Sequence, residues 1–500
     1  MKKLVSLLLA LTMLMTLVSA ASAEGSPVAL SVFLESSRPM DAHTEKVHQW
    51  AIDNIDVDIQ LIQGSADNYK QQLALYITSG DIPDVMVMDY NTYVAYAQEG
   101  VFADITDELG KYEALKAYQS AGVTERLKVE DRIYGFAAED TEGMYSISLR
   151  KDWLDKLNLK VPVTMDEMVE VMRAFTTKDP DGNGKADTYG YGGRFLWPFF
   201  GAYGVMPGYS TVNDEGIINT HSISEEYRQS LLLLRDLYAE KLIDPEIFTM
   251  TGEQQYQKWV QGQMGIFTHW WTHTGNAVTR YAFEELQPNG KAESFMPPTG
   301  PEGKSGMPAQ DPIAQVIAVS YKATPEKIAA AMRMLNAQAD PLTWRIFFYG
   351  VEGEYFEVDR DTNKTTWCWA VDGKNKAGES ITDTEVYKVL RQPYVQVQSD
   401  ELSERFGNQL RFQSFQICTG CDLIRNLFLG INTAEYQEMN ADVEAYTNEM
   451  RIRFILGEAS LENDWDAYVV DWLKKGGDKI RQSQLMVYNE TNGTDYHFAQ

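Results

Sequence analysis

A run of acidic and amide side chains at residues 179–187 has the spacing of a calcium-binding loop. Oxygen-bearing side chains stand at positions 1, 3, 5 and 9 and a backbone carbonyl at position 7: Asp179, Asp181, Asn183, Asp187 and Lys185. A glycine-containing turn with this spacing brings hard oxygen ligands together around one Ca²⁺ ion. Without a cation, the three carboxylates would repel one another. The sequence therefore predicts a structural calcium site, although position 12 is Gly190 where the bidentate Glu would stand; a metal-free polar turn is the alternative.

Aromatic side chains are the second group of residues that suits ligand contact, because flat rings pack against the C–H faces of sugars. Trp270 and Trp271 follow a strand-like run at residues 264–267. Successive residues of an extended chain point to opposite faces, so one is expected to meet a ligand and the other the core, with Trp270 preferred and Trp271 as the alternative. Burial in the core is the competing explanation for every such ring. Further ligand contacts are predicted for Trp197, Arg194, Arg391 and Tyr394.

The elements that would position these groups begin with an alternation of strands and helices. The hydrophobic pattern is strand-like at residues 28–34, 57–62 and 85–88, and helical at residues 43–55 and 69–77. This order predicts an α/β fold with a mostly parallel sheet. Ligands of such sheets collect beyond the carboxyl ends of the strands, so Ser36 and Asp89 are predicted ligand contacts.

The alternation resumes in the rest of the chain. Strand-like runs are expected at residues 134–138, 144–150, 264–267 and 313–319, and helices at residues 164–175, 225–241, 253–261 and 324–338. Thr164 and Glu167 form a capping box, and Thr324 precedes a proline in the first helical position. The pattern contains neither a fixed-period repeat nor a low-complexity linker. We therefore expect two α/β lobes joined by several crossings, residues 24–146 with 308–385 and residues 147–307 with 386–500.

The start of the chain has the features of a secretory signal peptide. Lys2 and Lys3 precede an apolar run at residues 4–18, and Ala21-Ser22-Ala23 is a small-residue cleavage site. A membrane anchor is the alternative, but the run is shorter than the roughly 20 residues that a span needs. We expect cleavage after Ala23, export to the periplasm or cell surface, no lipid attachment because no cysteine lies near that site, and no membrane insertion of the mature chain.

Charge and composition narrow the class of protein. The 500 residues are 44% hydrophobic and 12% aromatic, which suits a large folded core. The formal net charge is −28 at pH 7, which argues against nucleic acid as a partner. Three cysteines are too few for a disulfide scaffold; the redox state of the Cys418-x-x-Cys421 pair stays open.

Several segments resemble bacterial extracellular solute-binding proteins of family 1. The similar segments are SGDIPD at residues 79–84, RKDWLDKL at 150–157, DPDGNGKAD at 179–187, YGVEG at 349–353 and FILG at 454–457. The resemblance implies a two-lobed periplasmic-binding (Venus-flytrap) fold that serves an ABC importer, usually for carbohydrates. The calcium-bearing branch is similar to proteins that bind alginate or glycosaminoglycan oligosaccharides, with calcium in a structural role. Thr188 departs from the acidic residue that often follows the loop in that branch.

These features together predict a monomeric binding component of an ABC importer, without enzymatic activity. It would capture a carbohydrate, most simply an oligosaccharide, between its lobes and deliver it to the permease. A secreted glycan-active enzyme is the first alternative; it would need two carboxylates about 5 to 9.5 Å apart. A glycan-binding adhesin or chemoreceptor-linked protein is the second. The sequence leaves open which sugar is bound and whether the sugar is neutral or contains uronic acids.

Overall fold

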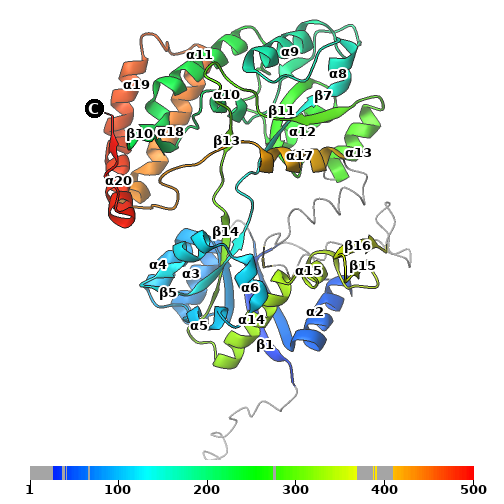
Figure 1. Ribbon diagram of the computed structural model, residues 1–500, viewed down its shortest axis with the longest axis vertical. Coiled ribbons are helices and arrows are strands. Elements are labelled where there is room, and N and C mark those ends of the chain that lie inside the picture. Colours follow the sequence, from blue (N-terminus) through cyan, green and yellow to red (C-terminus); the bar gives the residue numbers. More distant parts are fainter. Residues whose placement is uncertain are drawn as a thin grey trace, which may run out of the picture. The chain divides into compact units, whose positions relative to one another are not determined.

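The chain folds into two compact units, each with its own sheet and helices. The computed structural model describes residues 26–36, 40, 42–65, 68–273, 277–368, 387, 389–390 and 409–499. The first unit is Met1–Glu139 with Ile313–Pro393, and the second is Asp140–Pro312 with Tyr394–Gln500. Figure 1 shows both units with their elements labelled. Strands and helices alternate in each, so the α/β prediction is confirmed.

A five-stranded sheet forms the centre of the first unit. Its order is β2-β1-β3-β14-β6, with bounds β1 (Val28–Glu35), β2 (Val57–Gly64), β3 (Val85–Met88), β6 (Gly135–Glu139) and β14 (Ile313–Val319). β1 pairs in parallel with β2 and β3, whereas β14 is antiparallel to both of its neighbours. Because β2 and β3 lie on opposite sides of β1, the direction of winding reverses beside β1. Ligands of α/β sheets bind at such a reversal.

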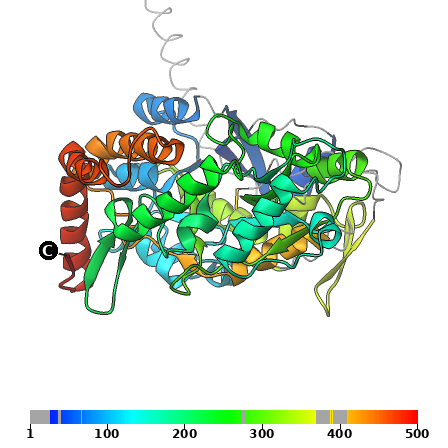
Figure 2. The ribbon, with the colours of Figure 1, turned by 90° about the horizontal axis from the view of Figure 1, so that it is seen from above.

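Helices pack around this sheet, and those at residues 42–55, 69–79 and 325–339 lie where the sequence predicted helices. The helices are α2 (Ala42–Ile55), α3 (Tyr69–Ser79), α4 (Tyr90–Gln98), α5 (Thr106–Leu109), α6 (Glu113–Tyr118), α7 (Ala121–Arg126), α14 (Pro325–Ala339) and α15 (Trp344–Tyr349). The hydroxyl of Thr324 caps α14 by accepting from the Lys327 amide at 3.3 Å, so the predicted helix start is confirmed. Two small hairpins complete the unit: β4 (Lys128–Val129) with β5 (Arg132–Ile133), and β15 (Phe356–Asp359) with β16 (Lys364–Trp367), the yellow strands in Figure 2.

The second unit has a four-stranded sheet in the order β12-β7-β11-β8. Its strands are β7 (Tyr145–Arg150), β8 (Tyr189–Tyr191), β11 (Met264–Trp270) and β12 (Ala292–Phe295). β7 is antiparallel to β11 and β12, and β11 is parallel to β8. The start of β7 therefore lies at the same edge of the sheet as the carboxyl ends of β8 and β11.

Helices cover this second sheet and extend it with a helical layer. They are α8 (Lys151–Lys156), α9 (Met165–Thr177), α10 (Trp197–Gly201), α11 (Glu225–Ala239), α12 (Gly252–Val260), α13 (Ala277–Leu286), α17 (Gln409–Gly420), α18 (Ala434–Leu456), α19 (Trp465–Trp472) and α20 (Asp478–Asn492). The predicted capping box at Thr164 and Glu167 is present, with both reciprocal hydrogen bonds. The orange and red helices α18, α19 and α20 lie together in Figures 1 and 2. A short ribbon of β9 (Ser210–Val212), β10 (Ile217–Thr220) and β18 (His497–Phe498) lies beside them.

A chain of buried hydroxyl groups and one imidazole joins three strands of the second sheet to α17. Ser148 on β7 contacts His269 Nε2 and Ser294 on β12, each at 2.8 Å, and Ser294 contacts Ser414 on α17 at 2.8 Å. Burial lowers the pKa of His269 to about 3, so the ring is neutral at physiological pH. The other ring nitrogen, Nδ1, lies 2.8 Å from the carbonyl of Trp270. This network fixes the end of β11, where Trp270 begins the candidate site.

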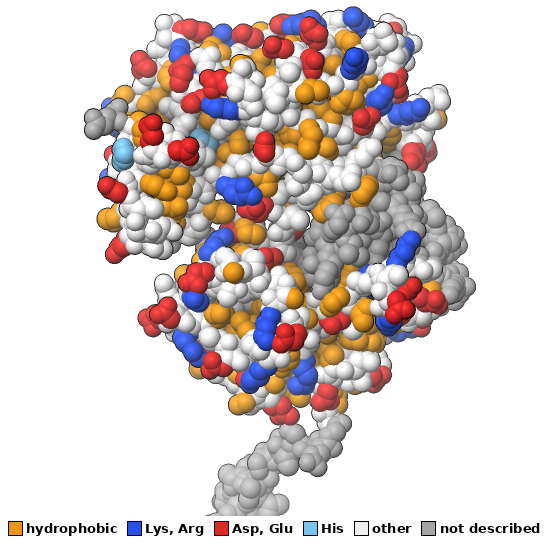
Figure 3. All heavy atoms as spheres, in the orientation of Figure 1, with side chains coloured by type: hydrophobic (Ala, Val, Ile, Leu, Met, Phe, Trp, Pro, Cys, Tyr) orange, Lys and Arg blue, Asp and Glu red, His pale blue; other side chains and the backbone are white. Residues whose placement is uncertain are grey.

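The surface carries side chains of both charges. On the face drawn in Figure 3, Lys and Arg side chains lie among Asp and Glu side chains. Over the part of the chain that the structure describes, no helix has both the length and the apolar character to cross a membrane.

Candidate functional site

The first unit has a cavity of about 350 Å³ at the carboxyl ends of β1 and β3. Its lining comes from those strands, from the first turn of α3 and from β14: Glu35, Tyr69, Lys70, Gln71, Val87, Met88, Asp89, Ala314 and Gln315. The ring of Tyr69 stacks on Phe33 at 4.6 Å and its hydroxyl donates to the Val87 carbonyl. Burial raises the pKa of this phenol. The cavity thus lies beside the reversal of the sheet, where the fold favours ligand binding.

Asp89 is the predicted site residue that lines this cavity. It caps α4 by accepting from the Thr92 amide at 3.0 Å, and it pairs with Lys70 at 3.0 Å. Burial alone would raise the pKa of Asp89, but the Thr92 hydrogen bonds and the ammonium of Lys70 outweigh burial and hold the pKa below its usual value. The carboxylate is therefore ionised and oriented, as an acceptor for ligand hydroxyl groups requires.

Ser36, the other residue predicted for this edge, lies one residue beyond β1. Its amide donates to the Gly64 carbonyl at 3.0 Å, and its hydroxyl accepts from Gln63 at 3.2 Å. Ser36 is not among the residues that line the cavity, whereas the preceding residue, Glu35, is.

In the second unit, four aromatic rings gather at the edge of the sheet where β8 and β11 end. Tyr145 lies opposite Trp270 in the β7–β11 pairing, with ring centroids 4.8 Å apart. Phe195 and Trp197, which follow β8, lie 5.1 and 6.0 Å from Tyr145. We call Tyr145, Phe195, Trp197 and Trp270 the ring group. It unites two predicted residues, Trp197 and Trp270, with two that sequence reasoning missed.

Trp270 and Trp271 have different surroundings, as the alternation of a strand requires. Trp270 is partly exposed within the ring group. Trp271 is 1% exposed and packs against Phe415 at 5.1 Å. The indole nitrogen of Trp271 is buried and has no hydrogen-bond partner among the described residues. Trp270 is therefore the ring of the two that is accessible to a ligand.

Of the predicted arginines and the predicted tyrosine, Arg194 is the one that the structure describes. It is exposed, and its guanidinium lies over the Phe195 ring at 5.2 Å, beside the ring group. Its backbone amide donates to Gln255 at 2.8 Å, which fixes the chain between β8 and α10. Arg391 and Tyr394 lie outside the described residues.

The predicted calcium loop lies between α9 and β8, and its oxygens accept hydrogen bonds from the loop itself. Asp179 accepts from the amides of Gly182 and Gly184, each at 3.1 Å. The Asn183 amide nitrogen donates to Asp181 at 2.6 Å and to Asp187 at 3.2 Å. These contacts hold two carboxylates at the Asn183 amide group, with the third, Asp179, on backbone amides of the same loop. The hydroxyl of the adjacent Thr188 donates to the Phe175 carbonyl at 2.8 Å.

The electrostatics of this loop favour a cation. Burial and the neighbouring carboxylates of Asp179 and Asp187 raise the pKa of Asp181. As the loop stands, no three His, Cys, Asp or Glu side chains of the described residues are grouped to hold a metal ion. The donor set nevertheless fits calcium, because three carboxylates and an amide are hard oxygen ligands and the cation would relieve their repulsion.

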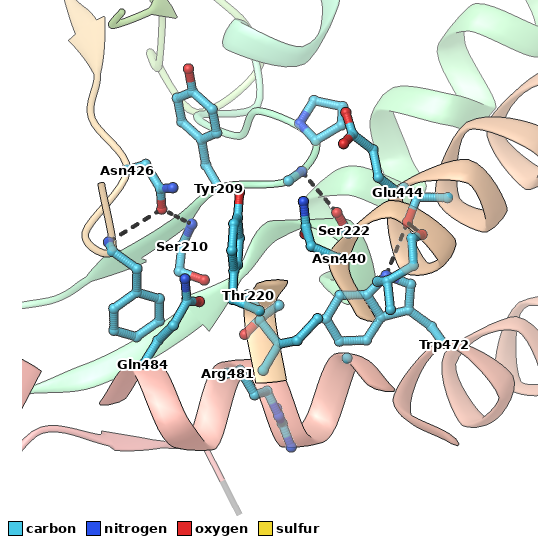
Figure 4. A pocket seen from close by; sticks show the side chains of 18 of the residues that line it. Tyr209, Ser210, Thr220, Ser222, Asn426, Asn440, Glu444, Trp472, Arg481 and Gln484 are labelled. Carbon is cyan, nitrogen blue, oxygen red and sulfur yellow. Dashed lines mark hydrogen bonds between the residues drawn. The ribbon is translucent and has the colours of Figure 1, made fainter. Parts of the chain in front are cut away.

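The second unit also contains a cavity of about 500 Å³, which sequence reasoning missed. Its walls are α18, α20, the segment at residues 426–432 and the ribbon of β9 and β10; Trp197 of the ring group also lines it. Figure 4 shows side chains from these elements and from adjoining segments around the cavity: Tyr209, Ser210, Thr220, Ser222, Asn426, Asn440, Glu444, Trp472, Arg481 and Gln484. We call it the α18 cavity.

One face of α18 supplies the polar side of this cavity. The lining residues of the helix recur at helical spacing: Tyr436, Asn440, Val443, Glu444, Thr447, Asn448 and Arg451. The opposite wall depends on a break between α19 and α20, where Gly476 has a φ of 126°. A Cβ atom on Gly477 would lie 2.3 Å from the Trp472 ring, so glycine is needed for that ring to sit at the start of α20.

Comparison with known proteins places the chain in a family. Residues 45–341, more than half of the chain, match bacterial extracellular solute-binding protein. The polygalacturonan/rhamnogalacturonan-binding protein YtcQ of Bacillus subtilis (strain 168) is 24% identical over 469 residues, covering 91% of this chain and 89% of the relative.

Solved structures show the same fold. The ABC-transporter substrate binding protein FusA of S. pneumoniae, in complex with kestose, has a TM-score of 0.68 at 20% identity, covering 94% of this chain and all of FusA. The alginate-binding protein AlgQ2 without calcium ion has a TM-score of 0.66 at 19% identity, covering 93% of this chain and 98% of AlgQ2. The chain therefore belongs to the bacterial extracellular solute-binding proteins.

Proposed function

We propose that this protein captures an oligosaccharide outside the cytoplasm and delivers it to the permease of an ABC importer. The ring group carries the proposal: four aromatic side chains at one sheet edge, beside the exposed guanidinium of Arg194. Aromatic faces bind the C–H faces of sugars, and charged side chains bind the hydroxyl groups. The relatives support the same class of ligand, since YtcQ is described as binding polygalacturonan or rhamnogalacturonan and FusA was solved with kestose.

The protein would act by binding and not by cleavage. Capture favours a closed arrangement of the two units because a ligand shifts a protein toward the state in which it makes more contacts. In this proposal each of the two units acts as one lobe, with Asp89 and Ser36 contributed by the first and the ring group by the second. Arg391 and Tyr394 remain predicted contacts. The signal peptide would direct export and be cleaved after Ala23, and the mature protein would act as a monomer.

A screen with oligosaccharides tests this function against the enzymatic alternative. The mature protein is incubated with neutral and uronic-acid-containing oligosaccharides, and the melting temperature and the sugar products are measured on the same samples. We expect at least one oligosaccharide to raise the melting temperature and to be recovered unchanged. New reducing ends would support a glycan-active enzyme, and an unchanged melting temperature over the whole panel would contradict the proposal.

We propose further that Asp179, Asp181, Asn183 and Asp187, with the carbonyl of Lys185, hold one structural Ca²⁺ ion. The support is the donor set and the crowding of three carboxylates in one loop. When bound, calcium would neutralise these charges and fix the connection between α9 and β8. The loop lies outside both cavities and the ring group, so the ion would not contact the sugar.

Removal of calcium is expected to destabilise the protein. At a free calcium concentration tenfold above Kd, binding stabilises the folded state by about 1.4 kcal/mol, and chelation should lower the melting temperature accordingly. Asp181→Ala should abolish this sensitivity to chelator, measured by thermal unfolding. Asp155→Ala removes an exposed carboxylate that pairs with Lys151 on α8, and this control should keep the sensitivity. Elemental analysis that finds no calcium in protein purified without chelator would contradict the site.

A further inference from the structure

We propose that the α18 cavity binds the carboxylate of an acidic sugar, a monoanion rich in hydroxyl groups. The inference rests on the proposed oligosaccharide-binding function and deepens it by naming a chemical class of ligand. Trp197 belongs both to the ring group and to the wall of the cavity. One oligosaccharide could therefore contact the rings with one sugar and place an acidic sugar in the cavity.

The cavity wall contains two arginines, and Arg451 is the one without a partner among the described residues. Among the described residues, no carboxylate lies within ion-pair distance of its guanidinium and no side chain hydrogen-bonds to it. Its Nε atom is buried and unsatisfied. A buried guanidinium nitrogen without a partner is unfavourable unless an anion or water completes its hydrogen bonds. The planar fork of a guanidinium matches a carboxylate with two parallel hydrogen bonds.

The other unpaired polar groups of the cavity suit sugar hydroxyls. The hydroxyl of Thr220 on β10 is buried without a partner in the described part of the chain. The amides of Asn440 and Asn448 and the carboxylate of Glu444 form no hydrogen bond or ion pair with another described residue. Glu444 and Arg451 lie seven residues apart on α18, which is roughly 10 Å along the axis. Glu444, which can accept from hydroxyl groups, and Arg451, which can donate to a carboxylate, thus lie at different positions along one face of the helix.

The charge balance favours a single negative charge on the ligand. The second arginine of the wall, Arg481, donates to Asp478 at 2.9 Å and lies over the Phe498 ring at 4.4 Å. Its charge is therefore already paired, whereas Glu444 adds an unpaired negative charge. One free guanidinium and one free carboxylate on the same helix face together disfavour a dianion such as a phosphate monoester. A sugar carboxylate carries one charge, and its hydroxyl groups match the amides.

Calorimetric titrations of the mature protein test the inference with four probes: D-galacturonate, D-galactose, trigalacturonate and neutral galactotriose. The variants are Arg451→Gln, Arg451→Lys and the matched control Arg453→Gln. Arg453 stands on the same helix, is exposed and contacts Glu449 at 3.7 Å outside the cavity. Arg451→Gln should weaken binding of the acidic probes at least tenfold and leave neutral probes unchanged. Arg451→Lys keeps the positive charge but loses the two parallel N–H donors of the guanidinium, so it should bind the acidic probes with intermediate affinity.

The outcomes separate this inference from the proposed function. Acidic probes that bind Arg451→Gln as tightly as wild type, or a wild type that binds only neutral sugars, would overturn the inference and leave the oligosaccharide proposal intact. Binding of D-galacturonate that depends on Arg451, without binding of any oligosaccharide, would support the cavity and contradict the function. If Arg451→Gln does not fold, as judged by thermal unfolding, Arg451→Lys is compared with Arg453→Gln. Weaker binding of the acidic probes by Arg451→Lys alone would support the inference, and equal affinities of the two variants would overturn it. An equal loss of affinity for the acidic probes in the Arg453→Gln control would show a general effect of positive charge and overturn the inference.

Discussion

Trp270→Ala is expected to weaken oligosaccharide binding by about 2 to 4 kcal/mol, by analogy with aromatic hot spots. This corresponds to roughly 30- to 1,000-fold in Kd. The physical reason is the position of Trp270 in the ring group, partly exposed and 4.8 Å from Tyr145. A sugar that lies on this face would lose its largest apolar contact, while the partial exposure limits the loss of fold stability. Calorimetry with the best oligosaccharide of the screen measures the change.

Trp50→Ala is a suitable control for this experiment. Trp50 is also a partly buried tryptophan, but it lies in the first unit and contacts Phe347 edge to face at 5.8 Å. Trp50→Ala should leave the sugar affinity unchanged. Equal affinities of wild type and Trp270→Ala would show that the ring group is not the sugar site.

Trp271→Ala is expected to have the largest effect on stability, about 3 to 5 kcal/mol in the free energy of unfolding. The side chain is 1% exposed and packs on Phe415, so truncation leaves a cavity between the end of β11 and α17. Chemical denaturation, with Trp270→Ala as the partly exposed comparison, measures the difference between the two neighbouring residues.

Trp271→Phe distinguishes packing from hydrogen bonding at this position. The indole nitrogen has no partner among the described residues, so phenylalanine should restore most of the stability by filling most of the space. A Trp271→Ala protein as stable as wild type, but deficient in sugar binding, would reverse the roles that we assign to Trp270 and Trp271.

The sequence predicted all five strands of the first sheet, and β7 and β11 of the second, because the hydrophobic periodicity of these segments is strong; the short strands β8 and β12 were missed. β3 is four buried apolar residues, as a strand covered on both faces requires. The start of α9 followed from Thr164 and Glu167, whose capping box is a local signal. Asp89 could be predicted as a cavity residue from its position after β3 alone, since the carboxyl ends of parallel strands meet at one edge.

The α18 cavity could not be predicted in this way. Its cationic residue, Arg451, stands on a helix with polar side chains around most of its surface, so periodicity does not separate a cavity face from a solvent face. The facing wall depends on the backbone break at Gly476 and on segments far apart in the sequence. Tyr145 was missed for a related reason: it joins the ring group through its pairing with Trp270 across strands 125 positions apart.

The central claim, that this chain binds an oligosaccharide and releases it unchanged, is tested most directly by one calorimetric titration. The mature protein is titrated at several temperatures with the best oligosaccharide of the screen, and the sugar is then recovered and sized by chromatography. We predict saturable binding, a negative heat-capacity change from burial of apolar ring faces, and recovery of a sugar of unchanged length. Absence of binding heat at every temperature, or recovery of shorter sugars, would contradict the claim.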